Sequence, residues 1–90
     1  MRYVVVDLEM NAINKNFEAR SICRNEIIEI GAVMLDEGMN EVDLFKTYVK
    51  PEYNGITNKI SKLTGITDSM VLMAPKFIWL LERASRERGM

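Results

Sequence analysis

The segment that most constrains the fold, residues 2–10, combines a run of three valines with two acidic residues, Asp7 and Glu9. Valine favours extended structure, and both alternating faces of the segment are mostly apolar, which is typical of a strand covered on both sides. Residues i and i+2 of a strand point to the same face, about 6.6 Å apart along the backbone. The two carboxylates are therefore expected side by side on one face.

Two interpretations of this acidic pair are open. Like charges beside a buried strand are costly unless a cation neutralises them, and Mg²⁺ prefers carboxylate oxygens. A pair of such ions can stabilise both oxygens of an in-line phosphoryl displacement. In the other interpretation, Asp7 and Glu9 lie at the wet end of the strand and have no chemical role. The pair alone does not decide between the two.

Composition limits the partners and the setting of the chain. Twelve basic and thirteen acidic side chains leave a net charge of −1, so a nucleic acid would be held by a local site rather than by a basic surface. The single cysteine, Cys23, allows no internal disulfide and indicates a reducing, cytoplasmic setting. The first apolar stretch is interrupted at Asp7, so neither a signal peptide nor a membrane span is expected. Histidine, the commonest general base, is absent.

The element pattern predicts an α/β fold. Alternating apolar residues and turn residues predict three antiparallel strands, over residues 2–10, 26–36 and 41–50, with a turn that pivots on Gly38 between the last two. Helical spacing and capping residues predict three helices, over about 57–64, 68–73 and 76–88. Thr57 is the expected N-cap of the first helix, Gly65 its C-terminal stop, and Pro75 is expected in the first turn of the last. Residues 11–25 are expected to form a long loop with room for one helical turn.

Five segments, in this order and spacing, resemble the DnaQ-like exonuclease family: VVVDLEMN, EIIEIGAVMLDEG, FKTYVKP, KISKLTGIT and AP-KF-WLL. The resemblance runs from Tyr3 to about Leu81 and is nearest to the Eri1-like and sporulation-inhibitor-like branch of the DEDD group. It implies a ribonuclease H-like fold. It also implies a 3′→5′ exonuclease that hydrolyses terminal phosphodiesters of single-stranded RNA or DNA with two Mg²⁺ or Mn²⁺ ions.

The resemblance also implies roles for particular residues. Asp7 matches the first acidic ligand, shared by both metal ions, and Glu9 matches the second, which also helps to place the attacking water. These two are the expected catalytic and metal-binding residues. The residues expected near the terminal nucleotide are Leu8, Met10, Asn11, Thr64, Gly65 and Ile66, with Ile66 packing on the 3′-terminal base.

The sequence departs from the family pattern at two motifs. The third carboxylate, in an Asn-x-x-x-Phe-Asp run, and the final motif with an Asp and a general-base His or Tyr do not occur in it. We therefore expect residues 1–90 to form a single, incomplete N-terminal half of the domain, with weak metal binding and little activity alone. The unfinished sheet predicts a homo-oligomer (a dimer or a swapped form) or a pairing with the missing C-terminal half. The alternative is a non-catalytic oligomeric module, derived from this fold, that binds nucleic acid or protein.

Four further residues have open interpretations. Glu29 and Gly31 share a face of the second strand, where Gly31 either leaves room near the metal ions or simply packs, and Glu29 faces solvent or a hydrogen-bond partner. Phe17, in the long loop, either stacks on a base or anchors the loop. Trp79 lies beside the apolar stripe of the last helix, on a surface that the absent half or a partner subunit would cover.

Overall fold

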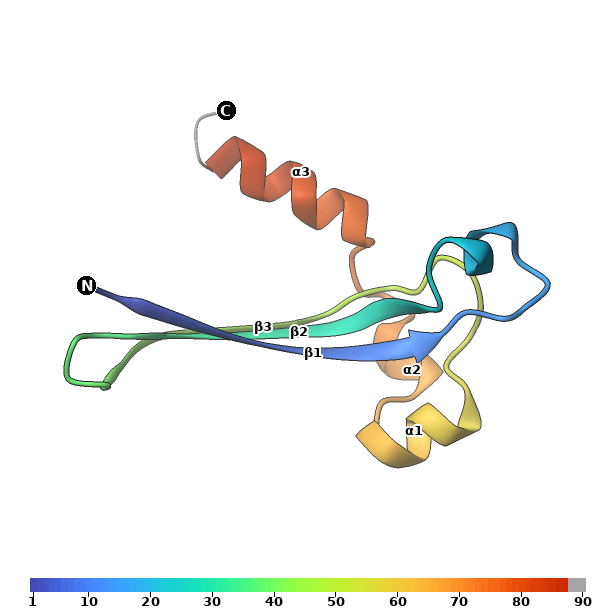
Figure 1. The fold of residues 1–90 in the computed structure, drawn as a ribbon, viewed down its shortest axis with the longest axis horizontal. Helices are drawn as coiled ribbons and strands as arrows, with labels where there is room; N and C mark the ends of the chain where they lie inside the picture. The colour runs from blue at the N-terminus through green and yellow to red at the C-terminus, as the bar shows by residue number, and fades with distance from the viewer. Residues whose placement is uncertain (88–90) are drawn as a thin grey trace.

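The computed structural model describes residues 1–87 and shows a twisted sheet with helices on both sides (Figure 1). The described residues form, in order, β1 (Tyr3–Ala12), a 3₁₀ turn η1 (Glu18–Ser21), β2 (Asn25–Leu35), β3 (Glu41–Tyr48), α1 (Asn58–Thr64), α2 (Asp68–Val71) and α3 (Phe77–Glu87). The predicted order of three strands followed by three helices is confirmed. The long loop contains the single helical turn for which the sequence left room.

The sheet is antiparallel in the order β1-β2-β3, so β2 is the central strand. β1 continues two residues further than predicted, to Ala12, whereas β3 stops at Tyr48, two residues early. Lys50 instead forms an isolated parallel bridge with Lys76, because its N–H donates to the carbonyl of Pro75 at 2.9 Å. Within the described chain, β1 and β3 are the two edge strands.

The turn between β2 and β3 is organised by Asp36. One of its carboxylate oxygens accepts hydrogen bonds from the N–H groups of Gly38 and Asn40, both at 2.9 Å. The residue with positive φ is Met39, at 66°, and not Gly38. The expectation that Gly38 is the pivot is therefore wrong, because the left-handed position falls one residue later in the turn.

The helix caps follow the sequence closely at α1 and less closely afterwards. The Thr57 hydroxyl accepts from the N–H of Ile60 at 3.2 Å, and Gly65 ends the helix with φ of 79°, as expected. α2 ends at Val71 rather than at residue 73, because the chain then closes into a turn in which the N–H of Ala74 donates to the carbonyl of Val71 at 3.1 Å. α3 begins at Phe77, so Pro75 precedes the helix instead of lying in its first turn. Residue 88, its predicted end, lies outside the described residues.

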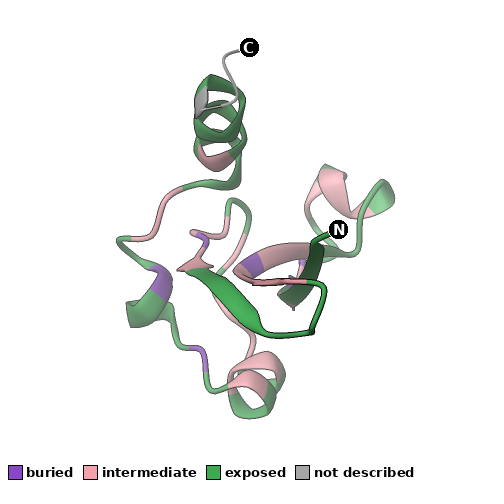
Figure 2. Ribbon diagram, turned by 90° about the vertical axis from the view of Figure 1, so that its left-hand side faces the viewer, coloured by how far each residue is buried: buried purple, intermediate pink, exposed green. Residues whose placement is uncertain are grey.

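The helices lie on different sides of the sheet and leave much of both faces exposed. α3 lies on one side, and α1 and α2 lie on the other, at the end of the sheet opposite the hairpin turn (Figure 1). The core is small and lies on the α1 and α2 side, where Ile28, Ile66 and Val71 are buried and Tyr48, Ile56 and Ile60 pack against them. Figure 2 shows buried residues only in short stretches of the ribbon. No helix of the described residues has the length and apolar character needed to cross a membrane.

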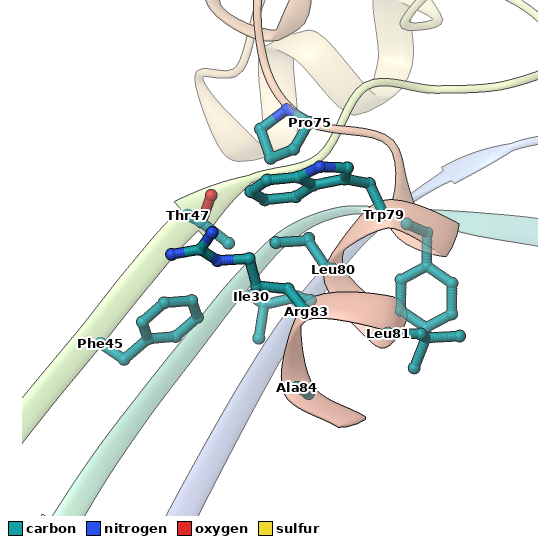
Figure 3. A pocket seen from close by; sticks show the side chains of 10 residues that line it. Ile30, Phe45, Thr47, Pro75, Trp79, Leu80, Leu81, Arg83 and Ala84 are labelled. Atoms are coloured by element: carbon teal, nitrogen blue, oxygen red, sulfur yellow. The ribbon is translucent and has the colours of Figure 1, made fainter. Parts of the chain in front are cut away.

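The valine run of β1 is exposed rather than buried. Val4, Val5 and Val6 keep 60%, 54% and 57% of their surface accessible. The sequence indicated a strand covered on both faces, and the structure differs because β1 is an edge strand along which no described element packs at this point. α3 leaves an open groove of about 520 Å³ above the sheet, with Phe45 and Trp79 among its lining residues (Figure 3).

Candidate metal and nucleic-acid site

Asp7 and Glu9 leave the same face of β1, as the strand period requires. In the register with β2, Asp7 lies opposite Gly31 and Glu9 lies opposite Glu29. Asp7 is exposed and Glu9 is partly buried. Neither carboxylate has a hydrogen bond or ion pair within the described chain, so both are available to a ligand from solution.

A β-bulge follows the acidic pair directly. The register shifts between Glu9 and Met10, so that Glu9 pairs with Glu29 but Met10 pairs with Ile27. The extra residue, Ile28, is fully buried in the core cluster. Bulges bend and twist a strand and are frequent beside active sites. Here the bulge anchors β2 on the core at the point where the acidic pair leaves β1.

The six expected nucleotide-binding residues do not all lie on the face of the acidic pair. Leu8 alternates with Asp7 and Glu9, so its side chain lies on the opposite face. Met10 contributes to a cavity shared with Phe77 and Ile78 of α3, which also lies on that opposite side. A contribution of Leu8 and Met10 to the acidic face would therefore come from their backbone atoms.

Asn11 connects β1 to the segment before α1. It is fully buried, its Nδ2 donates to the carbonyl of Gly55 at 3.0 Å, and its Oδ1 accepts from the N–H of Thr57 at 2.9 Å. Both ends of the amide are thus occupied by backbone groups. This side chain fixes the position of α1 relative to the acidic strand, a role that the residue order alone does not indicate.

The Thr64-Gly65-Ile66 segment lies at the end of α1. Thr64 donates from its hydroxyl to the carbonyl of Ile60 at 2.8 Å, and the same oxygen accepts from the N–H of Ile66 at 3.1 Å. Gly65 is exposed in a left-handed conformation, whereas Ile66 is buried in the core cluster. The fold therefore brings this segment to the same side of the sheet as the acidic pair and presents Gly65 to solvent.

An ion pair that sequence reasoning missed lies next to the acidic pair. Glu29 Oε2 is 3.7 Å from Lys46 Nζ, and the Glu29 side chain is only 17% exposed while that of Lys46 is 63% exposed. In the sequence, the only indication of this ion pair was two oppositely charged residues on separate predicted strands. Their proximity depends on strand register, which the sequence does not specify where faces are mixed.

Carboxylate oxygens are the donors that hard divalent cations prefer, so Asp7 and Glu9 fit a Mg²⁺ or Mn²⁺ ion as part of its ligand set. Among residues 1–87 no group of three or more Asp, Glu, Cys or His side chains is arranged to hold a metal ion. The described chain thus offers a pair of carboxylates rather than a complete cage.

The loop before β2 is held by its own side chains. The ring of Phe17 lies 5.7 Å from that of Tyr53, which confirms the interpretation of Phe17 as an anchor. Arg20 donates to the carbonyl of Ile13 at 2.7 Å, so its guanidinium supports the loop backbone. These contacts hold the loop in place next to the end of β1.

Comparison with known proteins identifies the family to which the acidic strand belongs. A family model described as RNase_T exonuclease matches residues 4–86, nearly the whole chain. The chain belongs to this exonuclease family. Its expected membership of the DnaQ-like 3′→5′ exonucleases, on the Eri1-like side, is confirmed.

Two curated relatives of this exonuclease chain are PolC-type DNA polymerases III. The protein of Caldanaerobacter subterraneus subsp. tengcongensis is 41% identical over 73 residues, which cover 81% of this chain and 5% of the relative. That of Thermotoga petrophila is 33% identical over 89 residues, covering 91% of this chain and 6% of the relative. The chain thus spans a small fraction of the length of either polymerase.

Solved exonuclease structures have the same fold. A full-length 3′-exonuclease matches with a TM-score of 0.74 and 28% identity, over 92% of this chain and 27% of that one. A 3′-exonuclease that recognises the 3′ end of a histone mRNA stem-loop matches with a TM-score of 0.74 and 29% identity, over 92% and 36%. Cell-death related nuclease 4, at 23% identity and a TM-score of 0.73, supports the fold alone. The expected ribonuclease H-like fold is confirmed.

Proposed function

We propose that this chain supplies the first metal-binding strand of a metal-dependent 3′→5′ exonuclease. The observation that carries the proposal is the pair Asp7 and Glu9, which leave one face of β1 without a partner in the described chain. Two unneutralised carboxylates at this position of an exonuclease-family strand suit a divalent cation. A bound Mg²⁺ or Mn²⁺ would supply charge stabilisation and an activated water for phosphodiester hydrolysis.

The substrate of the proposed activity is the 3′ end of single-stranded RNA or DNA. Support comes from the similar solved structure that recognises the 3′ end of a histone mRNA stem-loop. With a net charge of −1, the chain would hold such a strand at a local site rather than on a basic surface. In this proposal the exposed Gly65, with Thr64, borders the terminal nucleotide, and Asn11 holds α1 in position for it. Ile66 supports the segment from the core, where only 3% of its surface is exposed.

The ninety residues on their own should be a weak enzyme. They contain neither the Asn-x-x-x-Phe-Asp run nor a histidine, so Asp7 and Glu9 lack further acidic ligands and a base. Mg²⁺ keeps most of its waters when few carboxylates bind it. We expect weak binding of Mn²⁺ or Mg²⁺ and slow or undetectable hydrolysis by the isolated chain, in a cytoplasmic setting consistent with its single cysteine.

The free edge of β1 indicates a further strand as a partner. Ten residues of backbone lie along this edge, and Val4, Val5 and Val6 are more than half exposed. Such an edge pairs readily with another strand. We propose that the strand comes from a second copy of the chain or from a C-terminal half of the domain, which would also cover Trp79 in the groove under α3 (Figure 3).

Calorimetric titration with Mn²⁺ tests the metal assignment. Asp7→Asn should abolish the heat of Mn²⁺ binding, because it removes a charged oxygen ligand while it keeps the shape of the side chain. Asp43→Asn is the matched control, since Asp43 is an exposed carboxylate of β3 outside the acidic pair. Unchanged Mn²⁺ affinity in Asp7→Asn would contradict the proposal.

A nuclease assay tests the reaction itself. A 3′-labelled single strand is incubated with the chain and Mn²⁺, and the wild type is compared with Asp7→Ala. Any hydrolysis of the wild type should disappear in the variant, because the first ligand is missing. Hydrolysis by the Asp7→Ala variant would contradict the assignment of Asp7 as a metal ligand.

The edge of β1 is tested by light scattering over a range of concentrations. Val6→Lys places a charge on the exposed edge strand and should shift the chain toward the monomer. Val42→Lys is the matched control, since Val42 is 49% exposed on the other edge strand. A wild-type monomer at all concentrations would rule out association through β1.

A non-catalytic role is the second candidate. It is favoured by the absence, within residues 1–87, of any cluster of three potential ligands. In that case the chain would bind a single strand equally well with and without Mn²⁺, and Asp7→Asn would leave the affinity unchanged. Fluorescence anisotropy of a labelled oligonucleotide, with and without EDTA, distinguishes the two.

A further inference from the structure

The sheet register places two glutamates face to face. Glu9 of β1 and Glu29 of β2 are directly opposite each other in the antiparallel ladder. The pair Asp7 and Gly31 lies two residues away along the same strands. Directly opposite side chains have Cβ atoms about 4.5–5.5 Å apart, and like charges at this separation destabilise a sheet. Glu29 is therefore close enough to Glu9 to matter for any cation held there.

Lys46 is the cation that accompanies Glu29. Gly31 of β2 lies opposite Asp7 of β1 on one side and opposite Lys46 of β3 on the other. Asp7, Gly31 and Lys46 therefore form one row across the three strands. A Cβ built on Gly31 meets only the backbone oxygen of Asp7, at 3.8 Å. No side chain from β2 therefore stands between Lys46 and the acidic pair in this row.

The ion pair acts on Glu29 from the side away from β1. Lys46 Nζ is 3.7 Å from Glu29 Oε2, and the glutamate side chain is only 17% exposed. Since β2 lies between β1 and β3, attraction to Lys46 draws the Glu29 carboxylate away from Glu9. The lysine itself is 63% exposed and can be replaced without opening the core.

A Mg²⁺ ion used in hydrolysis needs coordination positions for water and phosphate oxygens. A third carboxylate from β2 would occupy one of these positions. We propose that Lys46 is a positioning residue that holds Glu29 out of the cation site, so that Asp7 and Glu9 alone bind the ion from this part of the sheet. This inference rests on the proposed metal-dependent function.

Mn²⁺ affinity of single and double variants at one fixed pH tests the proposal. Lys46→Met releases Glu29 toward the ion and should tighten Mn²⁺ binding by roughly threefold to tenfold, the scale of coupling between contacting residues. Lys46→Arg keeps the ion pair and should bind as the wild type does. In the Glu29→Gln background, Lys46→Met should no longer tighten binding, because the third carboxylate is gone. Equal tightening in both backgrounds, which a general charge effect would produce, overturns the role of Lys46.

Urea unfolding without metal provides a readout that does not depend on the proposed function. Lys46→Met should lower stability in the wild-type background, and should cost less in the Glu29→Gln and Glu9→Gln backgrounds, where the opposed charges are removed. Additive effects across this set mean that Lys46 does not act through Glu29, and the inference fails. Coupling in urea together with no Mn²⁺ binding in either wild type or Lys46→Met instead contradicts the metal function, and with it the role proposed for Lys46.

Discussion

A buried hydrogen bond joins two distant parts of the candidate site: Oδ1 of Asn11 accepts from the backbone N–H of Thr57, 46 residues further along the chain, at 2.9 Å. Thr57 is also the N-cap of α1. The buried amide of Asn11 thus helps to fix the end of the acidic strand to the start of the helix that leads to Thr64 and Gly65. Nδ2 donates to the carbonyl of Gly55 as well, and the residue is fully buried, so the amide is not exposed to a ligand from solution.

Removal of the Asn11 amide should destabilise the fold. Asn11→Ala leaves the partly buried N–H of Thr57 without its partner and leaves the carbonyl of Gly55 with Asn54 Nδ2 as its remaining donor, at a cost of about 2 kcal/mol. Urea unfolding measures the loss. Asn58→Ala, at an exposed position of α1, is the control and should change stability by less than about 0.5 kcal/mol. Equal stability of the two variants would show that the buried amide contributes nothing.

The hairpin turn should tolerate glycine better than methionine at position 39. Met39 has φ of 66°, a left-handed conformation that strains side chains, and it is 64% exposed, so its replacement loses little apolar burial. Met39→Gly should raise stability by roughly 0.5–1 kcal/mol after the entropy of glycine in the unfolded chain is counted. Thermal unfolding checks this, with Met39→Ala as the control that keeps the strain. A glycine variant less stable than the alanine variant contradicts the prediction.

Asp36 should make the hairpin sensitive to acid. The backbone N–H of Asn40 lowers the pKa of Asp36 most, the Asn40 side chain and the Gly38 N–H lower it further, and partial desolvation opposes them. A lowered pKa in the folded state means stability that is present above the ordinary carboxyl value, near pH 4, and lost as pH falls through the lowered value. Wild type should therefore exceed Asp36→Asn in stability at pH 7, and the difference should shrink in acid.

Urea titrations of the two proteins from pH 7 to about pH 3 measure this difference across the ordinary carboxyl range. Asp43→Asn removes the same charge from the neighbouring strand and corrects for the overall change in charge. If the difference in unfolding free energy between wild type and Asp36→Asn stays constant with pH, Asp36 is not the source of the acid sensitivity.

Ile28 should be sensitive to the loss of a single methyl group. It is fully buried at the bulge and packs with Ile66 and Val71. Ile28→Val should cost about 1 kcal/mol. Ile22→Val is a close control, because the same substitution at a residue that is 90% exposed should be neutral. Similar values for the two variants in urea unfolding would show that the bulge does not organise the core.

Local chemistry is sufficient for much of the architecture. The valine run and the period-2 pattern predict β1, the hydroxyl of Thr57 predicts the start of α1, and Gly65 predicts its end, because strand alternation and helix capping depend on residues a few positions apart. The order of these segments also predicts the exonuclease family, and the matching family model confirms it. Asp7 and Glu9 are placed on one face by the strand period alone.

Register and burial required the tertiary structure. Glu29 lies opposite Glu9 on one side and pairs with Lys46 on the other only because two strand pairings align them, and a one-residue slip would move each side chain to the opposite face. The position of the left-handed residue at Met39, and not at Gly38, depends on how the turn closes. The valine run indicated a covered strand, yet β1 is exposed, because burial depends on which other elements pack against a strand and not on its own composition.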